Sequence, residues 1–150
     1  MKRGRAENLC LQLMERSHCT ASIQVKTRFP GGRNVGGKYS MNLHQITIYV
    51  EEIHKQCLRI FGSLDTYEEV LQIICAHEVG HACDPHLAEL SDQLESSDNM
   101  LVRNRIALII EENAWAYAFK LLPEANPWIM SEMMNLSLQA YRDAVEQESA

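Results

Sequence analysis

The sequence predicts an α+β domain, in which a small three-stranded antiparallel sheet packs against a mainly helical body. Two observations support this fold class. Short alternating segments are confined to residues 21–50, and apolar residues recur at helical spacing through most of the remaining chain. The 150 residues suffice for one hydrophobic core, and no linker, repeat or low-complexity segment divides them. Residues 1–150 are therefore expected to form a single domain.

The first part of the chain is expected to supply one helix and the whole sheet. Residues 5–18 carry a ragged apolar face that predicts an amphipathic helix. Residues 21–28 alternate between apolar and polar side chains, and residues 38–43 and 45–50 predict two further strands. The segment 29–37 contains four glycines and a proline, which mark a loop. Three strands joined by short loops favour an antiparallel sheet.

The rest of the chain is expected to be helical. Apolar spacing predicts helices over residues 51–61, 65–83, 86–96, 99–122 and 127–147. Pro85 ends the second of these, because a proline disfavours helical geometry in the residue before it. Ser97 or Asp98 can cap the long helix, and Pro127 takes the first position of the last one.

Composition limits the compartment and the partners. The five cysteines are an odd number without a CxxC pair, which favours free thiols in a reducing compartment, the cytoplasm. No apolar run is long enough to span a membrane. The net charge of -6 is uneven, since residues 1–59 carry ten of the fourteen Lys and Arg. Two solvated faces explain this asymmetry, and without a nucleic-acid-binding motif a nucleic acid partner is not expected.

A candidate metal site lies at His77-Glu78-Val79-Gly80-His81. Residues four apart on a helix project from one face, so His77 and His81 can reach a single metal ion. Glu78 lies one residue further round, where it can act as a general base without binding the metal. The alternative is two core histidines satisfied by hydrogen bonds. The strongly apolar surroundings make that arrangement costly and favour a ligated site.

The third metal ligand is expected in the long helix. There, Glu112 falls in a polar stripe and has an ordinary explanation as a surface residue. Glu111 instead projects among Ala107, Ala114, Trp115 and Ala118, in the face that should meet the core. A carboxylate in that face is costly without a partner, and Zn²⁺ would supply one. The small residues, with Gly80, could let the two helices approach closely.

Two other candidate sites carry less weight. A metzincin-type pattern would need a histidine six residues after His81, where this chain has Leu87; His86 is one residue out of register. His86 remains a candidate for a substrate-side group. His54 and Cys57 have a spacing that could hold a metal, but without a second pair they favour a surface histidine and a buried cysteine.

The two motifs together resemble the gluzincin-type metallopeptidases, most closely the ImmA/IrrE-like family of small bacterial and phage-associated proteins. The resemblance lies in HEVGH at 77–81 and in the segment from Glu111 to Ala118, EENAWAYA. It extends over residues 5–123 in the order of the elements. One departure is Tyr117, where the family commonly has phenylalanine. No DNA-binding helix-turn-helix is found, which some relatives carry.

The expected function is therefore that of a zinc-dependent endopeptidase, in which His77, His81 and Glu111 hold Zn²⁺ and Glu78 is the general base. A protein or peptide substrate is expected beside residues 45–50, taken as an edge strand. A group that stabilises the oxyanion is open among Tyr39, His44, Tyr49, His86 and Tyr117. The alternatives are a zinc-containing protein-binding module without catalysis and a zinc hydrolase that acts on another substrate.

Overall fold

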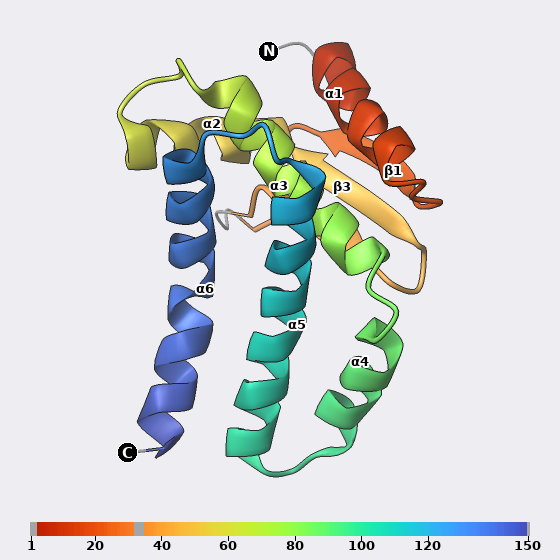
Figure 1. Ribbon diagram of the computed structural model, residues 1–150, viewed down its shortest axis with the longest axis vertical. Helices are drawn as coiled ribbons and strands as arrows, with labels where there is room; N and C mark the ends of the chain where they lie inside the picture. The colour runs from red at the N-terminus through yellow and green to blue at the C-terminus, as the bar shows by residue number, and fades with distance from the viewer. Residues whose placement is uncertain (1–2, 32–34, 150) are drawn as a thin grey trace.

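Six helices and one three-stranded sheet make up residues 3–31 and 35–149, which the computed structural model describes (Figure 1). Each predicted helix and strand is present, and the α+β class is confirmed. Residues 32–34 of the predicted loop lie outside the described residues. The elements are α1 (Arg3–Arg16), β1 (Ser22–Lys26), β2 (Gly37–Ser40), β3 (Gln45–Tyr49), α2 (Val50–Phe61), α3 (Tyr67–Ala82), α4 (Leu87–Ser96), α5 (Met100–Leu121) and α6 (Pro127–Ser149).

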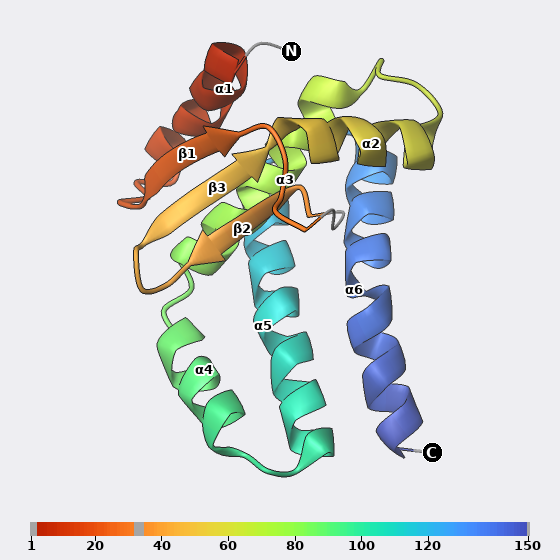
Figure 2. The same ribbon diagram turned by 180° about the vertical axis from the view of Figure 1, so that it is seen from behind.

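The sheet is mixed, so the prediction of a purely antiparallel sheet is wrong. Its strand order is β1-β3-β2, with β1 parallel and β2 antiparallel to β3. A short turn joins β2 to β3 as a hairpin. The longer connection from β1 to β2 carries the chain across to the far side of β3 (Figure 2). The third strand then returns between the first two, and it must run parallel to β1.

The central strand is β3, although residues 45–50 were expected at an edge of the sheet. Four of its residues, Ile46 to Tyr49, are at most 2% exposed. The helix α3 covers one face of the sheet, as Figures 1 and 2 show from both sides. On the other face, the ring of Phe29 packs edge-on against Tyr49 at 5.1 Å. The edges of the sheet are therefore β1 and β2.

The helix α3 runs through the core and packs against α1, the sheet and α5. It comes close to α5 at Gly80. A Cβ atom on Gly80 would overlap the carbonyl oxygen of Ala114 and lie 2.9 Å from its Cα atom. The expected close approach at small residues is thus present. Since a Cβ would be in the way, glycine is what allows the backbones of the two helices to meet.

The ends of the helices follow ordinary capping chemistry. Gly62 ends α2 in a left-handed conformation (φ 76°), which glycine adopts at little cost. The cap of α5 is Asn99, whose side chain accepts a hydrogen bond from the Val102 amide, and not Ser97 or Asp98. Pro127 begins α6 as predicted. The side chain of Asn126, just before it, accepts hydrogen bonds from the backbone amides of Trp128 and Ile129.

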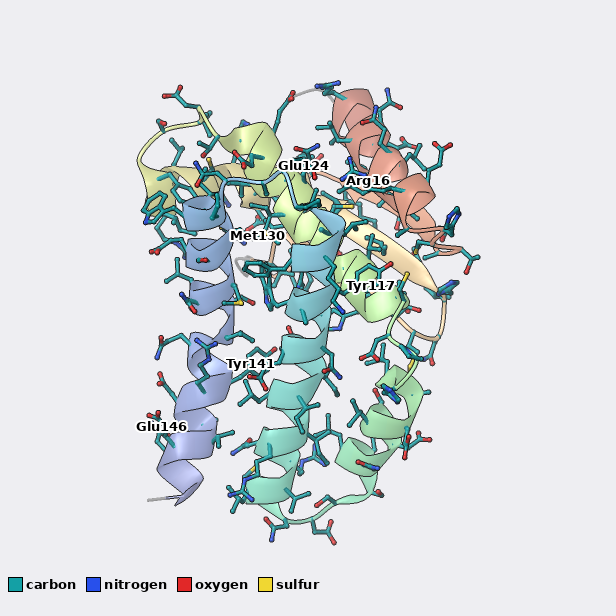
Figure 3. All side chains as sticks on the ribbon, viewed as in Figure 1. Arg16, Tyr117, Glu124, Met130, Tyr141 and Glu146 are labelled. Carbon is teal, nitrogen blue, oxygen red and sulfur yellow. The ribbon has the colours of Figure 1, made fainter. Side chains whose placement is uncertain are left out.

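The end of α1 is tied to the turn between α5 and α6. The Arg16 guanidinium donates to the carbonyl oxygen of Leu121 at 2.9 Å and to the carboxylate of Glu124 at 2.6 Å (Figure 3). All five cysteines are free thiols, as expected. Among the described residues, no helix combines the length and the apolar character that crossing a bilayer requires.

Candidate functional site

The second half of α3 carries a compact group of three polar residues. His77 and Glu78 are 8% and 6% exposed, and His81 lies one turn further along the same face. One possible ligand atom from each lies within 4.8 Å of the others. The i, i+4 spacing brings both imidazoles to the same side of the helix, as expected. Their rings are 4.7 Å apart, nearly perpendicular to one another.

Glu111 of α5 meets both histidines. Its Oε1 atom lies 3.3 Å from Nε2 of His77, and its Oε2 atom lies 2.9 Å from Nε2 of His81. Its side chain is 15% exposed, whereas Glu112 faces solvent. The contrast between these two neighbours agrees with their predicted positions on the helix. The residue chosen from the helical spacing is thus the one that reaches the α3 histidines.

The donor types of His77, His81 and Glu111, and one of their separations, are compatible with a zinc ion. Zinc lies about 2.0–2.2 Å from imidazole nitrogen and carboxylate oxygen ligands in a tetrahedral site, so two such ligand atoms are about 3.4 Å apart. The separation of 3.3 Å between His77 and Glu111 agrees with that geometry. The separation of 2.9 Å between His81 and Glu111 is that of a hydrogen bond. Two imidazoles and one carboxylate are also the donor types that zinc accepts.

The protonation of the group is set by burial and by mutual contacts. Burial would raise the pKa of Glu111, but hydrogen bonds from His77 and His81 lower it to about 2. Burial would lower the pKa of His81, whereas its bond to Glu111 and the charge of Glu78 raise it. Burial raises the pKa of Glu78, against the opposing charges of the histidines. Glu111 is therefore ionised at neutral pH, and Glu78 takes up a proton more readily than Glu111 does.

An aromatic wall fixes His77. Its ring packs on Trp115 at 4.6 Å, and Trp115 Nε1 donates to the hydroxyl of Ser137 on α6. The Nδ1 atom of His77 is buried and has no hydrogen-bond partner among the described residues. Within the described chain, the ring is therefore oriented by its packing on Trp115 and by Glu111.

The edge strand β2 passes directly beside Glu78. A Cβ atom on Gly37 would lie 3.1 Å from Cγ and 3.2 Å from Oε2 of Glu78. Glycine at this position lets the backbone of an unpaired sheet edge approach the carboxylate. The sequence marks Gly37 only as a loop residue, because the register that places it beside Glu78 depends on a distant pairing.

These groups open into a cleft of about 640 Å³ between β2 and the helices α2 to α6. Its wall includes Tyr141, which the sequence analysis missed and which lies on the side of α6 that faces α5 (Figure 3). Burial, then the charges of Glu111 and Glu78, raise the pKa of Tyr141, so its phenol can donate a proton to a hydrogen bond. The spacing of Met133, Ser137 and Tyr141 at i, i+4, i+8 could have indicated this stripe.

The other candidate residues lie mostly elsewhere. Of the five proposed for the oxyanion, only Tyr39 belongs to the described lining of the cleft. Its hydroxyl is bound to His44 at 2.6 Å. His86 is exposed ahead of α4, outside the converging group. His54 packs against the ring of Tyr67, and the buried Cys57 thiol donates to a carbonyl, so this pair forms no metal cluster within the described chain.

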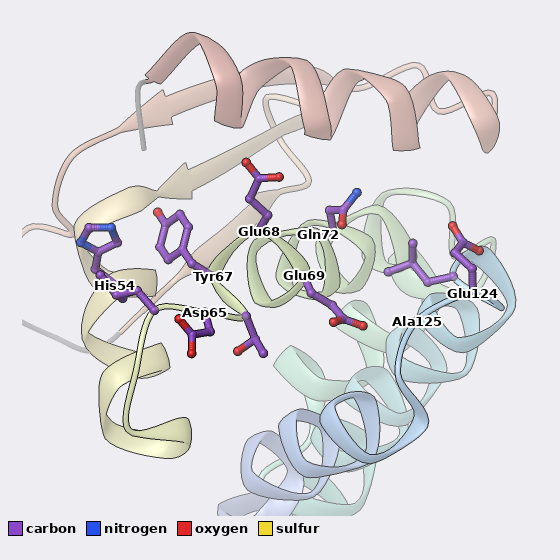
Figure 4. Close-up of a pocket in the computed structure, with 11 residues that line it drawn as sticks. His54, Asp65, Tyr67, Glu68, Glu69, Gln72, Glu124 and Ala125 are labelled. Carbon is purple, nitrogen blue, oxygen red and sulfur yellow. The ribbon is translucent and has the colours of Figure 1, made fainter.

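A second cavity of about 700 Å³ lies at the other end of α3 (Figure 4). It is the larger of the two and carries more carboxylates, three of which have ordinary partners. Glu68 is paired with Arg5, and Glu124 with Arg16. Glu69 accepts a hydrogen bond from the backbone amide of Asn126 at 2.6 Å. Described lining residues converge on no metal site here, so we place the candidate site in the cleft.

Comparison of the chain with known protein families, with curated proteins and with solved structures gives no match. What the cleft can do must therefore be inferred from its own residues.

Proposed function

We propose that this protein is a zinc-dependent endopeptidase of the cytoplasm that cleaves a protein or peptide substrate. The observation that supports it most is the meeting of Glu111 with both histidines of HEVGH, next to Glu78, whose Oε2 atom lies 4.0 Å from Nε2 of His77. A structural zinc site usually has four protein ligands. In the proposal His77, His81 and Glu111 would supply three, and Glu78 would act on a water in the fourth position. The proposal includes the resemblance to gluzincins and to the ImmA/IrrE-like family, and with it a regulatory role in a bacterial or phage element.

Each residue has a distinct part in the proposed mechanism. His77, His81 and Glu111 would hold Zn²⁺, which when bound acidifies water and polarises the scissile carbonyl. Glu78 accepts the proton of the attacking water and returns it to the leaving amine. Its burial and raised pKa suit both transfers. The Tyr141 phenol, held protonated beside these carboxylates, can donate a hydrogen bond to the carbonyl oxygen.

The substrate strand has a natural place on β2. This strand is an edge of the sheet, and its Gly37 lies against Glu78. An extended peptide that pairs with β2 would carry its backbone past Glu78, with side chains alternating into and out of the cleft. Residues 45–50, the strand expected from the sequence, cannot serve because β3 is already paired on both sides.

The deciding experiment compares zinc-loaded wild type with Glu78→Gln on labelled casein and on a synthetic peptide library. We expect Glu78→Gln to retain zinc and to lower kcat/KM by at least about 100-fold, the scale of a lost general base. Glu112→Gln, which changes a solvent-facing carboxylate on α5, is the matched control and should cleave at the wild-type rate. A zinc-loaded Glu78→Gln as fast as wild type refutes the mechanism. A zinc-loaded wild type that cleaves none of these substrates favours the binding module.

A further inference from the structure

The charges that line the cleft are divided between its walls. The carboxylates among the described lining residues are Glu78 and Glu111, and both belong to the candidate metal centre. The cationic residues of the lining are Lys38 on β2 and Arg59 on α2. The Lys38 ammonium, however, lies over the ring of Phe29, which packs on the face of the sheet away from α3. Arg59 is therefore the cation on the α2 wall, and no carboxylate of the described lining lies on α2 beside it. This cation favours a negatively charged group on the bound molecule.

Of the two cations, Arg59 has more capacity to form new hydrogen bonds and ion pairs. The Lys38 ammonium lies 5.9 Å from the centre of the Phe29 ring, over its face. The Arg59 side chain is exposed and has no ion pair or hydrogen bond with any residue that the structure describes. By contrast, Arg5 and Arg16 are each bound to a glutamate on a neighbouring element. Arg59 thus retains its planar set of donors, which matches a carboxylate.

Arg59 lies at the end of a continuous wall that starts at Glu78. Gly37 is against Glu78, and the adjoining Gly36 is close to Ile74 and Gln56, with distances of 3.0 and 3.3 Å from a Cβ atom built on it. Gln56 is three residues before Arg59 on α2, which puts both on one side of that helix. A peptide paired with β2 at Gly37 and extended towards α2 would therefore pass Arg59.

We propose that Arg59 binds a carboxylate of the peptide substrate, a few residues from the scissile bond, and so selects acidic segments. The carboxylate is that of an aspartate or glutamate side chain or of a free C-terminus. This inference rests on the proposed peptidase function. To that function it adds a preference for negatively charged substrates, which neither HEVGH nor Glu111 determines.

The test compares wild type, Arg59→Gln and Arg105→Gln on a synthetic peptide library. Arg105 is the matched control because it is an exposed arginine on α5 outside the lining of the cleft. In wild type we expect cleavage enriched next to an acidic residue or near the C-terminus. Arg59→Gln should lower kcat/KM for these peptides by about three- to tenfold, through KM, as expected for one partly solvated charge-assisted contact. Arg105→Gln should leave the profile unchanged.

A binding measurement separates this inference from the catalytic proposal. Fluorescence anisotropy of a labelled acidic peptide is measured on Glu78→Gln with and without Arg59→Gln, and we expect the added change to weaken binding by the same factor. Amidation of the peptide's C-terminus, or exchange of its aspartate for asparagine, then shows which carboxylate is bound. Wild-type cleavage without preference for a carboxylate, or equal binding by both variants, overturns the inference. If wild type cleaves nothing, the proposed peptidase function fails, while Arg59-dependent binding still supports a carboxylate-binding role of Arg59.

Discussion

Two cavities at opposite ends of α3 hold carboxylates in different ways. In the cavity of Figure 4, Glu68 and Glu124 are about half exposed and each faces an arginine from α1. In the cleft, Glu78 and Glu111 are largely buried, and no lysine or arginine contacts them in the described structure. Their neighbours are two imidazoles. Surface ion pairs contribute little to stability and need no further partner, whereas buried carboxylates against imidazoles require a proton or a metal.

The difference shows why neither the size of a cavity nor its number of acidic residues identifies a site. The larger cavity has more carboxylates, yet each of Glu68, Glu69 and Glu124 is already satisfied by an arginine or a backbone amide. In the cleft the partners of Glu111 are themselves possible metal ligands, the Nε2 atoms of His77 and His81 at 3.3 and 2.9 Å. What distinguishes the functional candidate is convergence of donors in a place from which water is mostly excluded.

The largest effect is expected for Glu111→Ala, which tests whether the cleft differs from the other cavity in binding zinc. Removal of a ligand should weaken zinc binding by more than the 10- to 100-fold typical of residues that only orient ligands, so we expect at least about a 100-fold increase in Kd. Zinc should also cease to raise the Tm of the protein, because that stabilisation depends on binding to the folded state. Isothermal titration with zinc and thermal scans with and without the ion measure both effects.

Glu112→Ala is the control, since this residue is adjacent but solvent-facing. Circular dichroism at low temperature confirms that both variants are folded. Equal zinc affinities for Glu111→Ala and Glu112→Ala would remove Glu111 from the candidate site. Such a result would mean that the buried Glu111 is no more needed for zinc binding than a solvent-facing glutamate.

A second variant tests the same contrast by changing the distance between α3 and α5. In Gly80→Ala the new methyl group would overlap the backbone of Ala114, so the helices must separate. We expect a loss of about 2–3 kcal/mol in the free energy of unfolding, measured with urea, as for overpacked cores. Zinc affinity should fall too, since Glu111 moves with α5.

Gly4→Ala is the matched control for this variant. An added Cβ there has no atom within 4 Å, so the gain in helix propensity should stabilise the protein by less than about 1 kcal/mol. A Gly80→Ala protein as stable as wild type would show that the two backbones can separate without cost.

The sequence predicted the parts of the fold and of the site that depend on local spacing. The helices follow from apolar periodicity, and the pairing of His77 with His81 follows from the helical repeat. Glu111 was found because a carboxylate in the apolar face of α5 is unusual, and it does contact both histidines. In each case the information lies within one helix.

The parts that were missed depend on residues that are distant in sequence. A hairpin loop and a crossover connection look alike in composition, so the parallel pairing of β1 with β3 could not be deduced. That pairing makes β2 the edge strand and places Gly37 at Glu78. Tyr141 and Arg59 reach the cleft only through the packing of α6 and α2, and each looks like an ordinary surface residue on its own helix.

The smallest effect is expected at Tyr67, which lines the second cavity. Its phenol donates to the carbonyl oxygen of Val50 at 2.9 Å, and burial, followed by the charges of Glu51 and Cys57, raises its pKa to about 12. The unfolded value is about 10. Because the folded pKa is the higher one, this residue's contribution to stability is complete below pH 10 and decreases as the pH rises towards 12.

Tyr67→Phe should therefore cost about 1 kcal/mol at neutral pH, the scale of one lost hydrogen bond, and should also flatten the alkaline loss of stability. Urea unfolding of both proteins at a series of pH values up to 11 measures the two effects. Zinc affinity should be unchanged, since Tyr67 is at the opposite end of α3 from His77 and His81. Parallel pH profiles would mean that the phenol is not held by Val50. Weakened zinc binding in Tyr67→Phe would mean that the two cavities are coupled through α3, and the contrast between a structural and a functional end of this helix would then no longer hold.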